Sequence, residues 1–255
     1  MYDIPEIREA TDSWWAGLAA AFRAEGLSDV PDTLNRIDDV ASLWGARDML
    51  FSQTCGYPLT HAWAGRLQVI GTPCYDAPGC EGASYRSLIL VREGANIHQL
   101  EDLAGKVVAF NGPDSLSGWL ALKLVFATLD KQGDFFDRWD VSGAHLASMT
   151  AVRNGEADVC AIDAVTHALA ARHQPDLTDS LVEIARSPEA PALPYVTRPD
   201  MPADDLQRMR TALTAAMTDP DLKDARQALF LSGVKIQGNK AYDAVLELER
   251  SLSSL

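Results

Sequence analysis

The chain has 255 residues, of which 47% are hydrophobic, and it carries a formal net charge of -14. This length and composition are typical of a globular α/β protein, arranged either as one large domain or as two lobes. The acidic charge argues against nucleic acid or an anionic membrane surface as partner, because both require a basic face, and no apolar run is long enough to cross a bilayer. A small anion remains compatible, because a local group of N–H and O–H dipoles binds an oxyanion whatever the charge of the distant surface.

Periodic apolar residues predict a helix and three strands in the first third of the chain. Apolar side chains recur at helical spacing over residues 7–24. Short apolar runs at residues 49–51, 67–72 and 87–91 predict strands. A short helix is then expected over residues 97–103.

The most informative segment is residues 111–119, which read Asn-Gly-Pro-Asp-Ser-Leu-Ser-Gly-Trp. It follows a predicted strand at residues 107–110 and precedes a predicted helix at residues 119–129. A strand that ends in small and hydroxyl residues and then opens a helix offers free N–H groups, hydroxyls and a positive dipole end, which suit an oxyanion. The alternative is an ordinary loop in which Ser115 or Ser117 is the helix N-cap.

Strands and helices alternate from residue 106 to residue 185. Strands are predicted at residues 141–144, 159–162 and 181–185, and helices at residues 148–155, capped by Ser148, and 164–172. This alternation favours a mostly parallel sheet with helices on both faces, in which ligands bind beyond the carboxyl ends of the strands. The polar residues that follow predicted strand ends are therefore expected to converge on one cleft: Ser52, Gln53, Thr54, residues 111–117, His145 and Asp163.

A two-lobed organisation is the interpretation that accommodates these elements. The Pro-rich run at residues 187–194 returns the chain from the second lobe, and helices are predicted at residues 203–217, 222–231 and 241–252. We expect residues 1–85 and 192–255 to form one lobe and residues 86–191 the other, with crossings near Tyr85 and Pro191. Each lobe is expected to be a mixed, mostly parallel sheet flanked by helices, with the ligand cleft between the lobes.

Several segments in order along the chain resemble the periplasmic substrate-binding proteins of phosphate/phosphonate ABC transporters, a family with the type II periplasmic-binding fold. The segments that carry the resemblance are residues 82–87, 100–106, 114–118, 142–148, 154–159 and the Pro-rich return. The resemblance implies a component of an ABC-type uptake system that binds phosphate, a phosphonate or a related organophosphate by hinge closure. It implies no chemistry, no cofactor and no metal, a periplasmic location and an ABC permease as partner; we also expect a monomer.

The same resemblance assigns roles to individual residues. The anion is expected to be held by the Ser115 and Ser117 hydroxyls and by the backbone amides from Leu116 to Trp119, which include those of Ser117 and Gly118. His145 matches the binding histidine of the family, and Tyr85 matches its aromatic at the crossing. First-lobe contacts are expected from Ser52, Gln53 and Thr54.

Departures from the family pattern concern the ligand. Leu116 stands where the family often has threonine, and Leu193 and Val165 stand where binders of aminophosphonates place carboxylates. A cationic amine on the ligand is therefore not expected, although Asp163 lies nearby and either accepts from the ligand or caps the helix after it. Tyr57 either lines the cleft or packs under a loop.

Two other functional classes remain open, and the cysteines bear on them. Cys74 and Cys80 can close a short loop in an oxidising compartment, whereas Cys55 and Cys160 are expected to be small core residues. An enzyme on the same scaffold would pair Ser115 or Cys160 as nucleophile with His145 as base. A cytoplasmic anion or metabolite sensor is the third class, which the lack of a visible signal sequence at the first residues favours.

Overall fold

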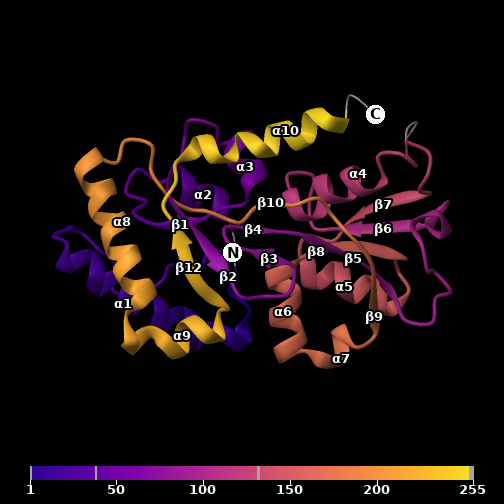
Figure 1. Ribbon diagram of the computed structural model, residues 1–255, viewed down its shortest axis with the longest axis horizontal. Helices are drawn as coiled ribbons and strands as arrows, with labels where there is room; N and C mark the ends of the chain where they lie inside the picture. Colours follow the sequence, from indigo (N-terminus) through magenta and orange to yellow (C-terminus); the bar gives the residue numbers. More distant parts are fainter. Residues whose placement is uncertain (1, 38, 131–132, 253–255) are drawn as a thin grey trace. The chain divides into compact units, whose positions relative to one another are not determined.

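The computed structural model describes residues 2–37, 39–130 and 133–252, and the chain forms two compact units (Figure 1). Unit 1 comprises Met1–Asp76, Glu81–Ala83 and Pro191–Asp243. Unit 2 comprises Ala77–Cys80, Ser84–Ala190 and Ala244–Leu255. The last segment groups with unit 2, whereas we expected the whole of residues 192–255 in the other lobe. The short strands β3 (Cys80–Glu81), β4 (Ser84–Tyr85) and β10 (Ala190–Pro191) lie where the chain passes from one unit to the other.

Unit 1 contains a four-stranded sheet with the strand order β1-β11-β2-β12. The strands are β1 (Ser52–Gln53), β11 (Tyr195–Thr197), β2 (Gln68–Tyr75) and β12 (Leu231–Lys235). Each neighbouring pair is antiparallel, because β11 and β12 return to the sheet in the direction opposite to β1 and β2. The expectation of a mostly parallel sheet is therefore wrong for this unit.

Helices of unit 1 cover the sheet through their apolar faces. Helix α1 (Arg8–Ala24) packs against α8 (Ala203–Thr218) and α9 (Lys223–Ala228), and its predicted position is confirmed. Leu18 and Phe22 of α1 are completely buried, and each contributes about 1.5–3 kcal/mol by leaving water. The remaining helices of this unit are η1 (Pro5–Ile7), α2 (Val40–Gly45), α3 (Gly56–Thr60), η4 (Pro220–Leu222) and η5 (Asn239–Tyr242).

Unit 2 is built on a five-stranded sheet with the order β7-β6-β8-β5-β9. The strands are β5 (Ser87–Arg92), β6 (Val107–Phe110), β7 (Arg138–Val141), β8 (Val159–Asp163) and β9 (Leu181–Arg186). Strand β6 pairs in parallel with β7 and β8, whereas β5 pairs antiparallel with β8 and β9. The sheet is mixed, as expected, but its parallel part is limited to the three strands around β6.

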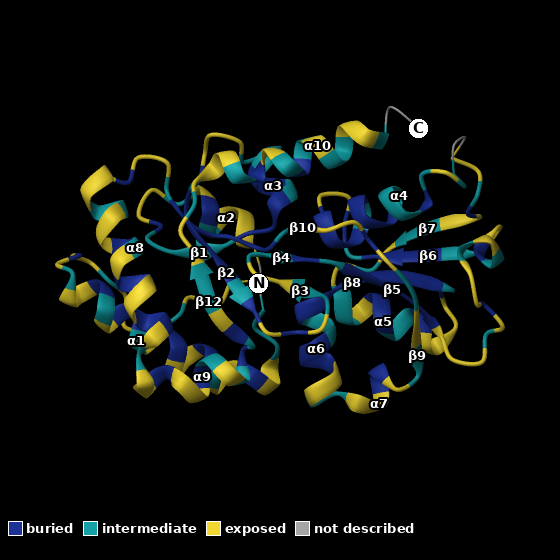
Figure 2. Ribbon diagram, viewed as in Figure 1, coloured by how far each residue is buried: buried dark blue, intermediate teal, exposed yellow. Residues whose placement is uncertain are grey.

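Helices pack on both faces of this sheet, which is why its central strands are continuous apolar runs. Every residue of β8 is buried, as is β5 up to Val91 (Figure 2). Two separate clusters of buried side chains fill the two faces, one containing Leu122 and Phe126 and the other Met149 and Val152. The helices of this unit are η2 (Leu100–Leu103), η3 (Leu116–Leu120), α4 (Ala121–Phe126), α5 (His145–Asn154), α6 (Ala164–His173), α7 (Pro175–Thr178) and α10 (Asp243–Leu252), of which only the first residue lies in unit 1.

Two element boundaries differ from the sequence prediction in ways that affect the site. Residues 141–144 are not a strand: β7 ends at Val141, Ala144 is the N-cap of α5, and His145 is the first residue of that helix. Ser148 is therefore inside α5 and completely buried, and it is not the cap. In unit 1, residues 222–231 are not one helix, because Phe230 has a positive φ of 56° that ends the helical segment before β12.

The turn after β6 is a single π-turn, η3, rather than the start of a regular α-helix. In this turn the N–H of Leu120 donates to the carbonyl of Ser115 at 3.0 Å, and the spacing of five residues is that of a π-helix. The turn places the Trp119 ring against Phe110 and Trp139, at centroid distances of 5.3 and 5.2 Å. The predicted helix thus begins three residues earlier than expected, and its α-helical part ends at Phe126.

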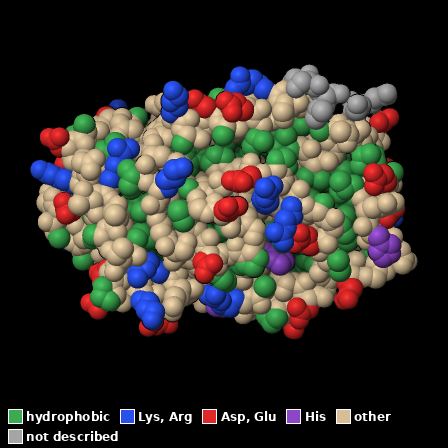
Figure 3. Space-filling model, viewed as in Figure 1, with side chains coloured by type: hydrophobic (Ala, Val, Ile, Leu, Met, Phe, Trp, Pro, Cys, Tyr) green, Lys and Arg blue, Asp and Glu red, His purple; other side chains and the backbone are tan. Residues whose placement is uncertain are grey.

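The surface bears charges of both signs. On the face drawn in Figure 3, acidic and basic side chains are interspersed. Among the described residues, no helix is both long enough and apolar enough to span a bilayer.

Candidate functional site

Ser115 and Ser117 begin the turn that follows β6. Ser115 is the N-cap of η3, and its Oγ accepts the N–H of Gly118 at 2.9 Å. A hydroxyl that accepts in this way still has its own hydrogen to donate, so capping and anion binding are compatible. Both serine residues retain 5% of their exposure, which places them in a largely water-excluded environment.

Gly118 is required by the space around it. A Cβ at this position would overlap the Oδ1 of Asn111, the first residue after β6. That Oδ1 is itself buried and has no hydrogen-bond partner among the described residues. The backbone of the turn therefore lies so close to the Asn111 side chain that a larger residue at position 118 would require this side chain to move.

A cluster of three side chains from three elements lies beside this turn. The Ser117 Oγ of η3 lies 2.8 Å from Nε2 of His145, the first residue of α5. The same Nε2 lies 3.5 Å from Oδ2 of Asp163, the last residue of β8. The parallel pairing of β6 with β8 brings the ends of these two strands to one edge of the sheet, where both side chains are found.

His145 is neutral near pH 7. Burial lowers its pKa below the usual 6.5, although the charge of Asp163 and the backbone of Ala161 oppose the shift. Since a carboxylate lies beside Nε2, we infer that the neutral ring carries its hydrogen there. Ser117 then accepts from the imidazole, and its own hydroxyl hydrogen is available to an anion.

This geometry does not provide an activated nucleophile. In a Ser-His-Asp triad the serine and the carboxylate bind opposite ring nitrogens, whereas here Ser117 and Asp163 both approach Nε2. The pairings considered for an enzyme are not formed either, because Ser117 rather than Ser115 lies at His145. Cys160 is completely buried, and burial strongly raises the pKa of its thiol.

Asp163 fulfils the structural role predicted for it. Its Oδ1 accepts the N–H of Thr166 at 2.9 Å, so it is the N-cap of α6. Leu116 and Tyr85, the other predicted binding residues of unit 2, are 2% and 1% exposed and belong to the core in this structure. Their predicted contacts with ligand remain predictions.

The residues predicted to bind from the first lobe lie in unit 1 and do not form one group. Gln53 donates through Nε2 to the Tyr75 hydroxyl and to the Leu193 carbonyl, and the Ser52 Oγ accepts from the Trp44 indole. Thr54 is completely buried and donates to the carbonyl of Cys55 at 3.3 Å. Tyr57 stacks on His61, with ring centroids 3.8 Å apart.

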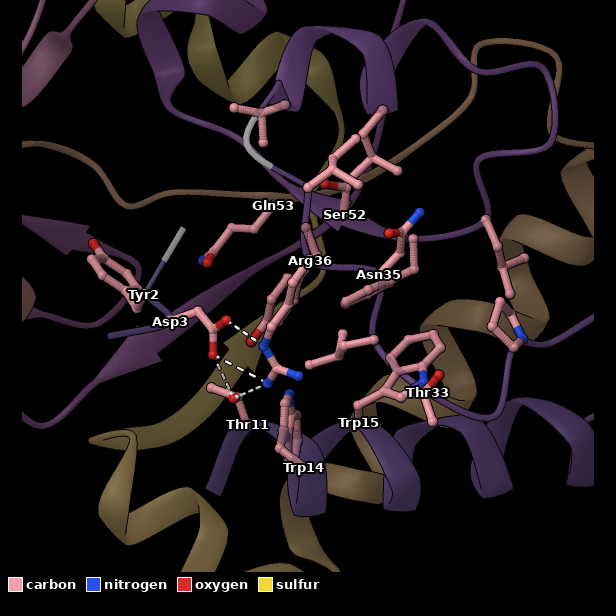
Figure 4. A pocket seen from close by; sticks show the side chains of 18 of the residues that line it. Tyr2, Asp3, Thr11, Trp14, Trp15, Thr33, Asn35, Arg36, Ser52 and Gln53 are labelled. Atoms are coloured by element: carbon pink, nitrogen blue, oxygen red, sulfur yellow. Dashed lines mark hydrogen bonds and ion pairs between the residues drawn. The ribbon is translucent and has the colours of Figure 1, made fainter. Parts of the chain in front are cut away.

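Ser52 and Gln53 also line a cavity of about 650 Å³ in unit 1 (Figure 4). Its wall includes several aromatic rings: Trp14, Trp15, Phe51, Tyr75 and Tyr195. Sequence patterns did not identify this cavity, because its walls come from segments far apart in the chain. Ser115, Ser117 and His145 are not among its lining residues.

A charged group closes part of the cavity wall. Arg36 pairs with Asp3 at 2.6 Å (Figure 4). It also pairs with Asp12 at 2.8 Å, so two carboxylates balance one guanidinium. The Arg36 guanidinium therefore has no excess positive charge with which to attract an anion. The hydroxyl and imidazole groups predicted to bind an oxyanion lie in unit 2, at Ser115, Ser117 and His145.

Cys74 belongs to unit 1 and Cys80 to unit 2, and no disulfide joins the described cysteines. Within residues 2–37, 39–130 and 133–252, no group of three or more His, Cys, Asp or Glu side chains is arranged to hold a metal ion.

Comparison with known proteins gives the family. A family model described as "ABC transporter, phosphonate, periplasmic substrate-binding protein" matches residues 43–242, most of the chain. The chain belongs to this family. The matched range contains Ser117, His145 and Asp163, the three residues of the cluster. A search of curated proteins found no match to this phosphonate-family binding protein.

Solved structures show the same fold at low sequence identity. A binding-protein component of an ABC phosphonate transporter from Pseudomonas aeruginosa is 18% identical with a TM-score of 0.79, over 98% of this chain and 83% of the other. PhnD1 from Prochlorococcus marinus, solved with methylphosphonate, is 14% identical with a TM-score of 0.78, over 99% and 96%. A Xanthomonas citri protein bound to ATP is 18% identical with a TM-score of 0.72, over 98% and 95%. The α/β, type II periplasmic-binding fold expected from the sequence is confirmed.

Proposed function

We propose that this phosphonate-family binding protein holds a small oxyanion with uncharged donors of unit 2 and releases it unchanged. The donors are the hydroxyls of Ser115 and Ser117, while the neutral imidazole of His145 donates its single N–H to Ser117 and so orients that hydroxyl. The observation that carries the proposal is the arrangement of these groups: Ser115 and Ser117 stand at the start of η3, each 5% exposed, and the Ser117 hydroxyl lies beside His145. Membership of the phosphonate-binding family supports it. Hydrogen bonds to an anion are stronger in such a water-excluded place than at the surface.

The acidic chain as a whole supports a local mode of binding. With a net charge of -14, attraction over long distances does not draw an anion to this protein. Short-range donation from fixed hydroxyl and amide groups requires no cation, and it discriminates ligands by their shape and by their hydrogen-bonding oxygens. We include in the proposal that hinge closure completes the site, that the protein acts as a monomer in the periplasm, and that it delivers the ligand to a membrane permease.

Calorimetric titration with methylphosphonate tests the proposal, because the similar PhnD1 was solved with that ligand. The double variant Ser115→Ala/Ser117→Ala is expected to lose at least about 100-fold in affinity, since two hydrogen bonds to a charged group contribute about 1.5–3 kcal/mol each. Ser180→Ala is the matched control, because its hydroxyl bonds the Leu177 carbonyl elsewhere in unit 2. Binding by the double variant that equals that of the wild type would show that the site is elsewhere.

Recovery of the ligand separates binding from catalysis. Methylphosphonate incubated with the protein and then released by denaturation is expected to give an unchanged ³¹P NMR spectrum. Appearance of inorganic phosphate would overturn the non-enzymatic part of the proposal.

A further inference from the structure

The cluster around Ser117 contains a buried carboxylate, which is an unfavourable neighbour for a bound anion. Asp163 is 2% exposed, and its Oδ2 lies 3.5 Å from the same His145 nitrogen that lies 2.8 Å from the Ser117 hydroxyl. Its Oδ1 is occupied by the N–H of Thr166. The Oδ2 therefore retains acceptor capacity on the side of the cluster that carries His145 and Ser117.

The titratable neighbours of Asp163 are uncharged near pH 7. Burial lowers the pKa of His145 and also that of His167 on α6, so both rings are neutral. Burial and, to a smaller extent, the charge of Asp163 raise the pKa of Cys80 to about 12, so this thiol is also neutral. The Coulomb interaction that acts on His145 comes from Asp163 itself.

The next charged groups outward balance each other. Arg186 and Glu183 on β9, which both act on His167, form an ion pair with a distance of 2.6 Å. The cluster thus presents one carboxylate together with uncharged hydroxyl and imidazole groups.

A second negative charge beside this carboxylate is unfavourable unless a hydrogen lies between the two. Like charges a few ångströms apart repel even at the intermediate effective dielectric of a protein surface. A phosphonate or phosphate monoanion carries one P–OH hydrogen that can occupy this position. A dianion or a sulfonate has no such hydrogen.

We propose that Asp163 selects a singly protonated oxyanion: its Oδ2 accepts the P–OH hydrogen, while Ser115 and Ser117 donate to the unprotonated oxygens. The inference rests on the proposed function and names the protonation state that the site accepts. Dianions and sulfonates are then excluded by the carboxylate rather than by the size of the site.

The pH dependence of methylphosphonate binding tests this selection in the wild-type protein. A phosphonate loses its second proton near neutral pH. Between about pH 7 and 9 the imidazoles of His145 and His167 stay neutral and the Cys80 thiol stays protonated, so the ligand is the group of this set that titrates. Calorimetric titration is expected to show affinity falling about tenfold per pH unit above the second pKa of the ligand, because only the monoanion is competent.

Methanesulfonate is the matched ligand, because it has the same shape and a single negative charge but no acidic hydrogen. We expect it to bind the wild-type protein at least about 100-fold more weakly than methylphosphonate at pH 7, since a site built around a hydrogen bond rejects an analogue that lacks it. Asp163→Asn preserves an N-cap for α6 and places an amide donor at the same point. This variant is expected to gain methanesulfonate binding and to lose the pH slope for methylphosphonate.

Asp114→Asn is the control variant, because it removes an exposed carboxylate from the loop that precedes Ser115. It is expected to keep both the pH slope and the preference for methylphosphonate. Methylphosphonate affinity in the wild type that stays constant or rises with pH, or methanesulfonate binding of equal strength, would overturn the role of Asp163. If neither ligand binds the wild type at any pH, the proposed function itself fails, and this inference fails with it.

Discussion

Replacing Gly118 by alanine tests how closely the turn η3 packs against the Asn111 side chain at the end of β6. The added methyl group would overlap the Asn111 Oδ1 and lie 3.1 Å from its Cγ and 3.2 Å from the Ser115 Oγ. The turn cannot move away freely, because the Gly118 N–H is held by Ser115 at 2.9 Å. Asn111 can move, since its buried Oδ1 makes no hydrogen bond to the described residues that would be lost. Overpacking of this kind costs about 1–3 kcal/mol, and each kcal/mol lowers the Tm of a chain of this size by about 2–4 °C.

Calorimetric melting of Gly118→Ala, Asn111→Ala and the double variant measures this overlap directly. Removing the Asn111 side chain makes room for the methyl group, so the double variant should recover most of the loss, with a coupling free energy of about 1–3 kcal/mol. Gly233→Ala is the control, because no atom lies within 4 Å of its added Cβ, and it should stay within about 0.5 kcal/mol of the wild type. A Gly118→Ala protein that melts with the wild type, or two substitutions whose effects simply add, would refute the reasoning.

Three further substitutions test the site and the core. Ser115→Ala removes the cap of the Gly118 N–H and should cost about 1 kcal/mol in urea unfolding, whereas Ser115→Asn should restore most of it; an equal loss in both variants would contradict the capping role. His145→Gln should reduce the acid sensitivity of folding. Because the pKa of His145 is lowered in the folded chain, its imidazole takes up a proton more readily in the unfolded chain, and the free energy of unfolding of the wild type falls as pH drops below about 6.5. Parallel pH profiles for wild type and variant would exclude this cause. Leu122→Ala empties a completely buried position and should cost about 2–5 kcal/mol by chemical denaturation; a loss below about 1 kcal/mol would show that this face of the sheet is loosely packed.

Local patterns in the sequence were sufficient to locate the turn at residues 111–119. Its strand, β6, occupies the predicted residues, Ser115 is the cap that its position implied, and Asp163 caps the helix that follows it. Each of these features depends on residues within a few positions of one another, so hydrogen-bonding type and strand periodicity are informative. The ligand contacts assigned to these residues from the family resemblance remain predictions.

Features that depend on partners distant in sequence were not predicted. Strand β12 (Leu231–Lys235) was not predicted, and only its first residue fell within the helix expected at residues 222–231, because a short segment alone does not reveal that β2 is its partner. Nor did spacing show that Ser117 and Asp163 approach one nitrogen of His145, since this depends on where α5 begins. The pairing of Arg36 with Asp3 in the wall of the unit 1 cavity joins side chains 33 positions apart. In each case the contact depends on the three-dimensional arrangement of the chain, and the local sequence pattern does not indicate which residues meet.

The π-turn after β6 ties the length of one short loop to the aromatic core. Such a turn contains one residue more than an α-turn, so deleting a single residue from η3 (Leu116–Leu120) would let an ordinary helix form there. Every side chain on the amino-terminal side of the deletion would then be rotated by about 100° relative to α4. Either Trp119 keeps its contacts with Phe110 and Trp139 and the serine hydroxyls turn away, or the hydroxyls keep their positions and Trp119 loses these contacts. Relatives that keep both features should therefore keep the residue count of this loop, even where its amino acids differ.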